Sequence, residues 1–115
     1  MTTTISLGAG AEDLAARALA RAGYAIVERN FRCVAGELDI VARDRDVLVF
    51  VEVRSRADAS HGHAAEMVSR RKQRQVARVA LHYIAARDPI FLRSRFDVVA
   101  ITGGDVELIR DAWRL

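Results

Sequence analysis

Residues 36–56 read GELDIVARDRDVLVFVEVRSR, and this stretch decides the fold. Its two arms are rich in Val, Ile and Phe, which favour β-strands, yet the arms also carry Asp39, Glu52 and Arg54. Between them, the polar residues 43–46 have the right length for a hairpin turn, so the sequence predicts two antiparallel strands. With the chain reversing near residues 44 and 45, we expect Asp39 to lie a strand step or two from Glu52.

Side chains alternate between the two faces of a strand, and this alternation predicts which residues share a face. The first arm divides into two sets of three: Glu37, Asp39 and Val41 on one face, and Leu38, Ile40 and Ala42 on the other. The second arm divides into two sets of four: Val47, Val49, Val51 and Val53, and Leu48, Phe50, Glu52 and Arg54. If Asp39 and Glu52 share a face of the sheet, their carboxylates can together hold one divalent cation.

The charged residues of these arms also have a purely structural interpretation, as solvent-facing side chains of an edge hairpin. Residues 47–51 argue against it, because their continuous apolar run suits a strand that is buried on both faces. Glu52 follows this run directly, and an unpaired ion in such a position is costly. We therefore expect a partner for Glu52, which is either Arg54 in a structural ion pair or a metal ion.

The length of 115 residues indicates a single domain over residues 1–115 with one core between layers of secondary structure. No apolar run approaches the roughly 20 residues that cross a bilayer, and the first ten residues lack the pattern of a signal peptide. We therefore expect no membrane association. A single cysteine, Cys33, allows no internal disulfide and suits the reducing cytoplasm.

The charge balance points weakly towards a nucleic-acid partner. The chain has 18 Lys and Arg residues against 15 Asp and Glu residues, and all the basic residues except one are Arg. Guanidinium groups suit bidentate contacts with phosphate. A GC-rich genome also replaces Lys with Arg, so composition alone does not decide. The oligomeric state is not specified by the sequence, and a homodimer is one possibility.

Two amphipathic helices are predicted, over residues 8–22 and 64–86. Glu12 borders the apolar stripe of the first helix, where it can either reach over a sheet or simply suit the helix dipole. The second helix gathers four arginines on its polar side, which is either a solvated or a phosphate-binding face: Arg70, Arg71, Arg74 and Arg78. Lys72, the only lysine, falls in the apolar stripe, either as a snorkelling side chain or as a cation directed at the carboxylates.

The remaining elements complete an α/β pattern. A polar loop is predicted over residues 57–62, and further strands are predicted over residues 24–31, 96–102 and 105–109. Gly103 and Gly104 favour a two-residue hairpin turn between the last two strands. The resulting order α, β, β, β, α, β, β predicts a central mixed sheet that is flanked by helices.

These residues resemble the YraN-type family of small, largely uncharacterised bacterial proteins. The resemblance covers nearly the whole chain and is carried by Glu12, Gly36-Glu37-Leu38-Asp39-Ile40, Phe50-Val51-Glu52-Val53-Arg54, Arg56, Gly62, Lys72 and Arg95-Phe96-Asp97. It implies a restriction-endonuclease-like fold that is similar to archaeal Holliday-junction resolvases. In PD-(D/E)xK nucleases, Asp39 would match the metal-binding Asp, Glu52 the acidic residue and Arg54 the position usually held by Lys. Glu12 would match the helix-borne acid of the resolvase branch.

The resemblance implies a nuclease that hydrolyses phosphodiester bonds of structured or branched DNA, in recombination or repair. Mg²⁺ or Mn²⁺ would be held by Asp39 and Glu52, with Glu12 as a third candidate ligand. Arg54 departs from the pattern because Arg stabilises charge but does not exchange a proton at ordinary pH. Either Arg54 suffices, or Lys72 supplies the ammonium group, or catalysis has been lost.

Two functions from other classes therefore remain open beside the nuclease. One is a nucleic-acid-binding module that keeps the fold but cleaves nothing, which Arg54 favours. The other is a protein-interaction subunit whose carboxylates form only structural ion pairs.

Overall fold

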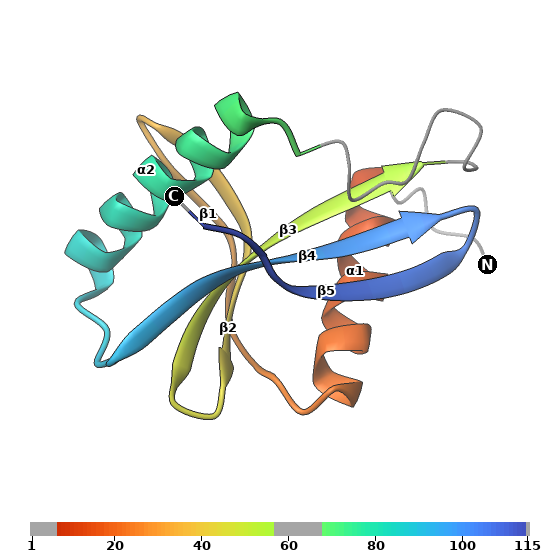
Figure 1. Ribbon diagram of the computed structural model, residues 1–115, viewed down its shortest axis with the longest axis horizontal. Helices are drawn as coiled ribbons and strands as arrows, with labels where there is room; N and C mark the ends of the chain where they lie inside the picture. The colour runs from red at the N-terminus through yellow and green to blue at the C-terminus, as the bar shows by residue number, and fades with distance from the viewer. Residues whose placement is uncertain (1–6, 57–67, 115) are drawn as a thin grey trace.

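The computed structural model describes residues 7–56 and 68–114, which form a mixed five-stranded sheet with two helices (Figure 1). In chain order the elements are α1 (Leu7–Arg21), β1 (Ala25–Cys33), β2 (Gly36–Asp44), β3 (Val47–Arg56), α2 (Arg70–Arg87), β4 (Arg93–Thr102) and β5 (Asp105–Trp113). The predicted order of elements is confirmed. The architecture is α/β and consistent with a restriction-endonuclease-like fold. Within the described residues, neither helix is long and apolar enough to cross a membrane.

The strands lie in the sheet in the order in which they occur along the chain, from β1 to β5. All neighbours pair antiparallel except β3 and β4, which are parallel over their whole length. Parallel neighbours need a crossover connection, and the segment that contains α2 provides it. The five strands therefore divide into a three-stranded antiparallel unit, β1 to β3, and a hairpin, β4 with β5.

The sheet separates two hydrophobic cores, whereas the sequence predicted one, and the central strand β3 shows how they are divided. Leu48 and Phe50 pack into the core on the α2 face, whereas Val49 and Val51 pack into the core on the α1 face. The alternation that the sequence predicted for this strand is confirmed, and continuing it places Glu52 on the α2 face. Buried residues of the helices complete the cores: Ala15 and Leu19 from α1, and Val76, Val79, Ala80 and Tyr83 from α2.

The alternation predicted for the start of β2 is wrong. Leu38 packs into the core on the α2 face, but Ile40, two residues later, packs into the core on the α1 face. In a regular strand both side chains would point to the same side. The change occurs at Asp39. On β1, Phe31 pairs with Leu38 and Arg29 pairs with Ile40, and Asn30, which lies between them, has a left-handed backbone with φ 57°.

The second helix starts later than predicted, at Arg70. Ser69 caps it, because its side-chain Oγ accepts a hydrogen bond from the backbone N–H of Lys72 at 3.2 Å, a common role of Ser at this position. Asp88 ends the helix in a left-handed conformation, and its N–H reaches the carbonyl of Ile84. Residues 64–67, where we predicted the first helical turn, and the loop predicted over 57–62 lie outside the described residues.

The last two strands are longer than predicted. β4 begins at Arg93, and β5 continues past residue 109 to Trp113. The extension includes Asp111, whose φ of 53° accompanies a register shift between β4 and β5. Trp113 is buried, and its ring stacks on Phe96 with the centroids 4.9 Å apart. The bulge therefore lets the strand carry Trp113 back onto the core.

Replacing Gly36 with Ala should destabilise the fold by about 1–3 kcal/mol. Gly36 has φ 140°, which L-residues rarely adopt, and a Cβ there would lie 2.8 Å from Gln75 Nε2 and 3.3 Å from Val79 Cγ2. Urea denaturation would measure the loss. The matched control is Gly104→Ala, because Gly104 has φ 96° and no atom within 4 Å of the added Cβ. Equal losses in both variants would contradict a role for close packing at Gly36.

Candidate functional site

Asp39 and Glu52 lie together where β2 separates from β3. The pairing of the two strands ends at Ile40 and Val51. Beyond this point the backbone N–H of Val53 donates to Asp39 Oδ2, at 2.8 Å. The Asp39 side chain thus takes the place of the backbone carbonyl that would accept this hydrogen bond if the two strands stayed paired. The hydrogen bond fixes the Asp39 carboxylate beside Glu52.

Glu52 is almost fully buried, with 4% of its surface exposed. Burial raises the pKa of Glu52, and a hydrogen bond to Asp39 and the negative charge of Asp39 raise it further, to about 8. The positive charges of Lys72 and Arg54 act in the opposite direction. At neutral pH, without a bound cation, the two carboxyl groups therefore share a proton.

Two cations flank the carboxyl pair. Arg54 places Nη2 4.0 Å from Glu52 Oε1, and its buried Nε has no hydrogen-bond partner in the part of the chain that the structure describes. Lys72 comes from the first turn of α2, is half-buried, and acts electrostatically on Glu52. The structure thus brings both candidates for the catalytic cation near the same carboxyl group.

Glu12 approaches Asp39 from α1. Burial raises the pKa of Glu12, the charge of Asp39 raises it further, and a hydrogen bond from the Asn30 side chain lowers it. Arg29 Nη2 lies 3.7 Å from Glu12 Oε1. Among the residues described, no three Asp, Glu, His or Cys side chains converge closely enough to enclose a metal ion. The predicted ligand set therefore forms one close pair, Asp39 with Glu52, with Glu12 as a more distant third carboxylate.

The Asp39–Glu52 pair fits a divalent cation on electrostatic grounds. Two carboxylates in hydrogen-bonding contact repel each other when both are ionised, so a proton or a cation must compensate their charge. Mg²⁺ prefers oxygen ligands, keeps several water molecules, and is often bound by only one or two carboxylates together with phosphate oxygens of a substrate. Two protein carboxylates are therefore enough for a metal that also binds a phosphate.

The start of α2 adds a concentration of positive charge. Its first turn contains no acidic residue. The positive end of a helix dipole disfavours nearby cations, so this arrangement favours a negatively charged partner from outside the chain. The four arginines predicted for a phosphate-binding face are all exposed: Arg70, Arg71, Arg74 and Arg78.

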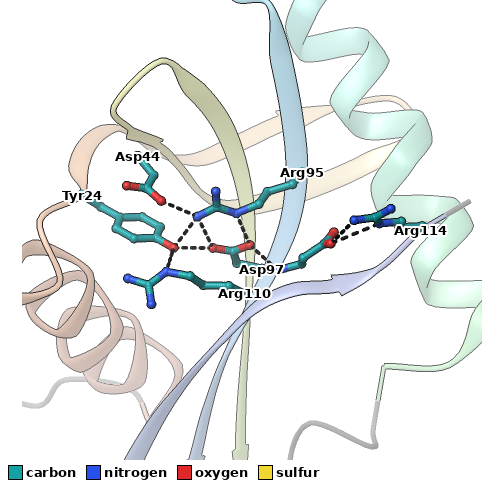
Figure 2. A network of polar contacts seen from close by, with 7 residues as sticks. Tyr24, Asp44, Arg95, Asp97, Arg110 and Arg114 are labelled. Atoms are coloured by element: carbon teal, nitrogen blue, oxygen red, sulfur yellow. Dashed lines mark hydrogen bonds and ion pairs between the residues drawn. The ribbon is translucent and has the colours of Figure 1, made fainter.

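A second polar cluster, centred on Asp97, lies on the α1 face of the sheet and was missed by the sequence analysis (Figure 2). Asp97 is completely buried. Its carboxylate accepts hydrogen bonds from Arg95 Nε at 2.9 Å, from the Tyr24 hydroxyl at 2.7 Å and from the backbone N–H of Asp111 at 2.9 Å. These bonds satisfy the buried charge and connect the chain before β1 to β4 and β5.

Arg95 and Arg110 extend the Asp97 cluster towards the end of the sheet where β3 and β4 begin. Arg95 Nη2 donates to Asp44 at 2.8 Å, and Arg110 Nε donates to the Tyr24 hydroxyl at 3.0 Å. The sequence offered two signals for this cluster. Arg95-Phe96-Asp97 was among the motifs that carry the resemblance, although no role was assigned to it. Asp97 directly precedes the apolar run 98–101, as Glu52 follows another, so it also needed a buried partner.

The comparisons with known sequences all identify the same protein family. A sequence profile of the Uncharacterised protein family UPF0102 matches residues 11–101. A UPF0102 protein of Methylibium petroleiphilum is 48% identical and covers 98% of this chain and 98% of its own. Similar proteins of Chlorobaculum tepidum (48% identity, 83% of this chain and 74% of theirs) and Syntrophotalea carbinolica (50%, 84% and 79%) carry the same family name. The matched region includes Glu12, Asp39, Glu52, Arg54 and Lys72.

Proposed function

This chain belongs to the UPF0102 family, as its YraN-type resemblance predicted, and we propose that it is a metal-dependent nuclease acting on structured or branched DNA. The family name assigns no activity, so the proposal rests on the site. The observation that carries it is the close pair of Asp39 and buried Glu52, with Lys72 and Arg54 beside it. The preference for branched DNA follows from the resemblance to Holliday-junction resolvases.

The chemistry of phosphodiester hydrolysis accounts for each of these side chains. Bound Mg²⁺ or Mn²⁺ would polarise the phosphate and lower the pKa of a water molecule. Asp39 and Glu52 would hold that ion. The guanidinium of Arg54, whose buried Nε has no hydrogen-bond partner among the described residues, can donate to a phosphate oxygen. The ammonium of Lys72 can stabilise charge that develops in the transition state.

A nucleic-acid-binding module without catalysis is the second candidate, and Arg54 is the observation that favours it. Cleavage of a panel of duplex, flap, single-stranded and four-way-junction DNA with Mn²⁺ separates the two functions. A nuclease cleaves at least one substrate only when the metal is present. A binding module retains the DNA in a mobility-shift assay but leaves all substrates intact.

Replacing either Asp39 or Glu52 with Ala should abolish Mn²⁺ binding while the far-UV circular dichroism spectrum stays that of the wild type. Each substitution removes one of the two oxygen ligands that a partly hydrated ion needs. Isothermal titration calorimetry measures the binding. Asp46→Ala is the control, because this exposed carboxylate pairs with Arg93 away from the site. If both site variants bind Mn²⁺ as the wild type does, the metal site is wrongly assigned.

The exposed arginines at the start of α2 should contribute phosphate contacts. Changing Arg70 and Arg71 together to Ala should weaken DNA binding for all sequences and flatten the salt dependence by up to about 2 units, at roughly 0.9 per lost contact. Fluorescence anisotropy across a salt series measures this slope. Arg17→Ala, an exposed site on α1, is the control for a simple loss of charge. An unchanged slope in the double variant would identify these arginines as an ordinary solvated face.

A further inference from the structure

We propose that the groove at the end of the sheet where β3 and β4 begin binds a phosphate group, with Arg110 as the principal contact. This site is separate from the Asp39–Glu52 pair. Val47, which lines the groove, precedes Glu52 by five residues on β3, a distance of about 17 Å along an extended strand. The proposal does not depend on nuclease activity.

The groove consists of two adjoining hollows with volumes of about 490 and 630 Å³. Both hollows are lined by Val47, Arg93, Arg95 and Arg110. The first also includes Arg114, and the second also includes Arg45. Five arginines therefore line one continuous depression together with three aspartates, Asp44, Asp46 and Asp111, and this excess of positive charge favours a negatively charged ligand.

The groove arginines differ in how fully carboxylates of the protein neutralise their charge. Arg95 donates to both Asp97 and Asp44, so its charge is fully matched within the protein. Arg93 lies 3.3 Å from Asp46, but both side chains are more than 60% exposed, and such surface pairs contribute little. Arg93 is therefore available to a ligand at little cost.

Arg110 differs from Arg93 and Arg95, because no carboxylate of the described residues matches its charge. Within the described residues it forms no ion pair, and its only hydrogen bond runs from Nε to the Tyr24 hydroxyl at 3.0 Å. The guanidinium also lies over the Tyr24 ring, 5.5 Å from its centroid. Because Tyr24 is itself held by Asp97, Arg110 is fixed in position with its two Nη groups free to donate (Figure 2).

The aromatic residues around the groove explain why we assign a phosphate rather than a nucleobase. Trp113 is buried and stacks on Phe96, which also lies 5.9 Å from the Phe50 ring. The Tyr24 ring has Arg95 and Arg110 against it. Base recognition commonly requires an open aromatic face, whereas guanidinium groups match phosphate oxygens without one. The groove should therefore bind phosphate regardless of the base attached to it.

Titration of the ¹⁵N-labelled full-length protein with inorganic phosphate, at constant ionic strength, tests the site directly. The arginine Nε–H signals of Arg110 and Arg114 should shift in a saturable manner. Binding should weaken at least about fivefold in Arg110→Gln and also in Arg93→Gln, whose exposed side chain lies outside the Tyr24 cluster and leaves the fold intact. Arg17→Gln should bind as the wild type does. Unsaturable shifts, or unchanged affinity in both groove variants, would overturn the proposal.

A second arm identifies the source of the phosphate. If it belongs to a nucleic-acid strand, Arg110→Gln should lower the salt slope for a single-stranded oligonucleotide by about 0.7 and that for a duplex by about 0.9. Saturable phosphate binding with unchanged slopes would support the same site with a small phosphate ester as its ligand. Asp39→Ala should retain groove binding, so a failure of the nuclease proposal remains distinguishable from a failure of this one.

Discussion

Replacing Glu52 with Gln should stabilise the fold above neutral pH by about 2–4 kcal/mol and should also abolish metal binding. Gln has the shape of a protonated Glu and cannot ionise. The folded wild type holds the Glu52 pKa near 8, mainly through burial, against an ordinary value of 4.5. Each unit of such a shift corresponds to about 1.4 kcal/mol, and the shared proton of the Asp39–Glu52 pair reduces the total.

The direction of the pH effect follows from proton binding in the two states. Between about pH 4.5 and pH 8 the folded protein keeps the Glu52 proton that the unfolded chain has released. The stabilisation is therefore fully present below pH 4.5 and is lost as the pH rises through 8. Urea denaturation at pH 5 and pH 8.5 should show the variant gaining stability relative to the wild type only at the higher pH.

A control of opposite sign is available at Glu28. A hydrogen bond from Arg87 lowers the pKa of Glu28, so Glu28→Gln should lose stability at high pH instead of gaining it. Mn²⁺ should raise the melting temperature of the wild type but not that of Glu52→Gln, because only the wild type gains a ligand on folding. An identical pH dependence of the wild type and Glu52→Gln would show that Lys72 and Arg54 already neutralise the buried charge.

Lys72→Met should reduce DNA cleavage by about 10²–10³-fold, the usual cost of removing a group that stabilises transition-state charge. Lys72 acts on buried Glu52 from the first turn of α2, which places its ammonium near the proposed metal site. Met keeps the packing of the side-chain stem, so the stability of the fold should change little. Arg54→Lys should preserve or raise activity.

Two further measurements identify the role of Lys72. The loss of its charge removes one of the influences that lower the Glu52 pKa, so any residual cleavage by Lys72→Met should require a higher pH. Arg71→Met removes the charge of the neighbouring exposed residue and should weaken DNA binding without the same loss of turnover. If Lys72→Met cleaves DNA at the wild-type rate in a Mn²⁺ assay, Lys72 has no catalytic role and is only a snorkelling side chain.

The core of the candidate site was predictable because it depends on local patterns. Alternation along β3 fixed the face of Glu52, and the turn after residue 44 brought Asp39 alongside it. The predicted phase of α2 is consistent with the half-buried side chain of Lys72, although the helix began later than predicted. The periodicity of apolar residues and the length of a turn depend only on residues that are close in the chain. Both can therefore be recognised in a single sequence.

The parts that were wrong or missed depend on contacts between distant residues. The reversal of faces at Asp39 coincides with a hydrogen bond from the backbone N–H of Val53 to its side chain and with the left-handed backbone of Asn30 on β1. The Asp97 cluster joins Tyr24 to Asp97 across 73 positions of the chain. A periodic pattern of apolar residues does not predict a contact between residues so far apart in the chain. The sequence position of Asp97 indicates that it needs a partner but does not identify that partner.

The irregularities in the two outer strands have a consequence for self-association. β1 and β5 form the open edges of the sheet, where unpaired backbone groups of one copy could pair with those of another. β1 has a register shift between Ile26 and Glu28 and a left-handed residue at Asn30, and β5 has the left-handed Asp111 within its own register shift. Such bulges twist an edge and interrupt its row of hydrogen-bonding groups. Aggregation by strand addition is thereby disfavoured at both edges, and a homodimer of this chain would have to form through another surface.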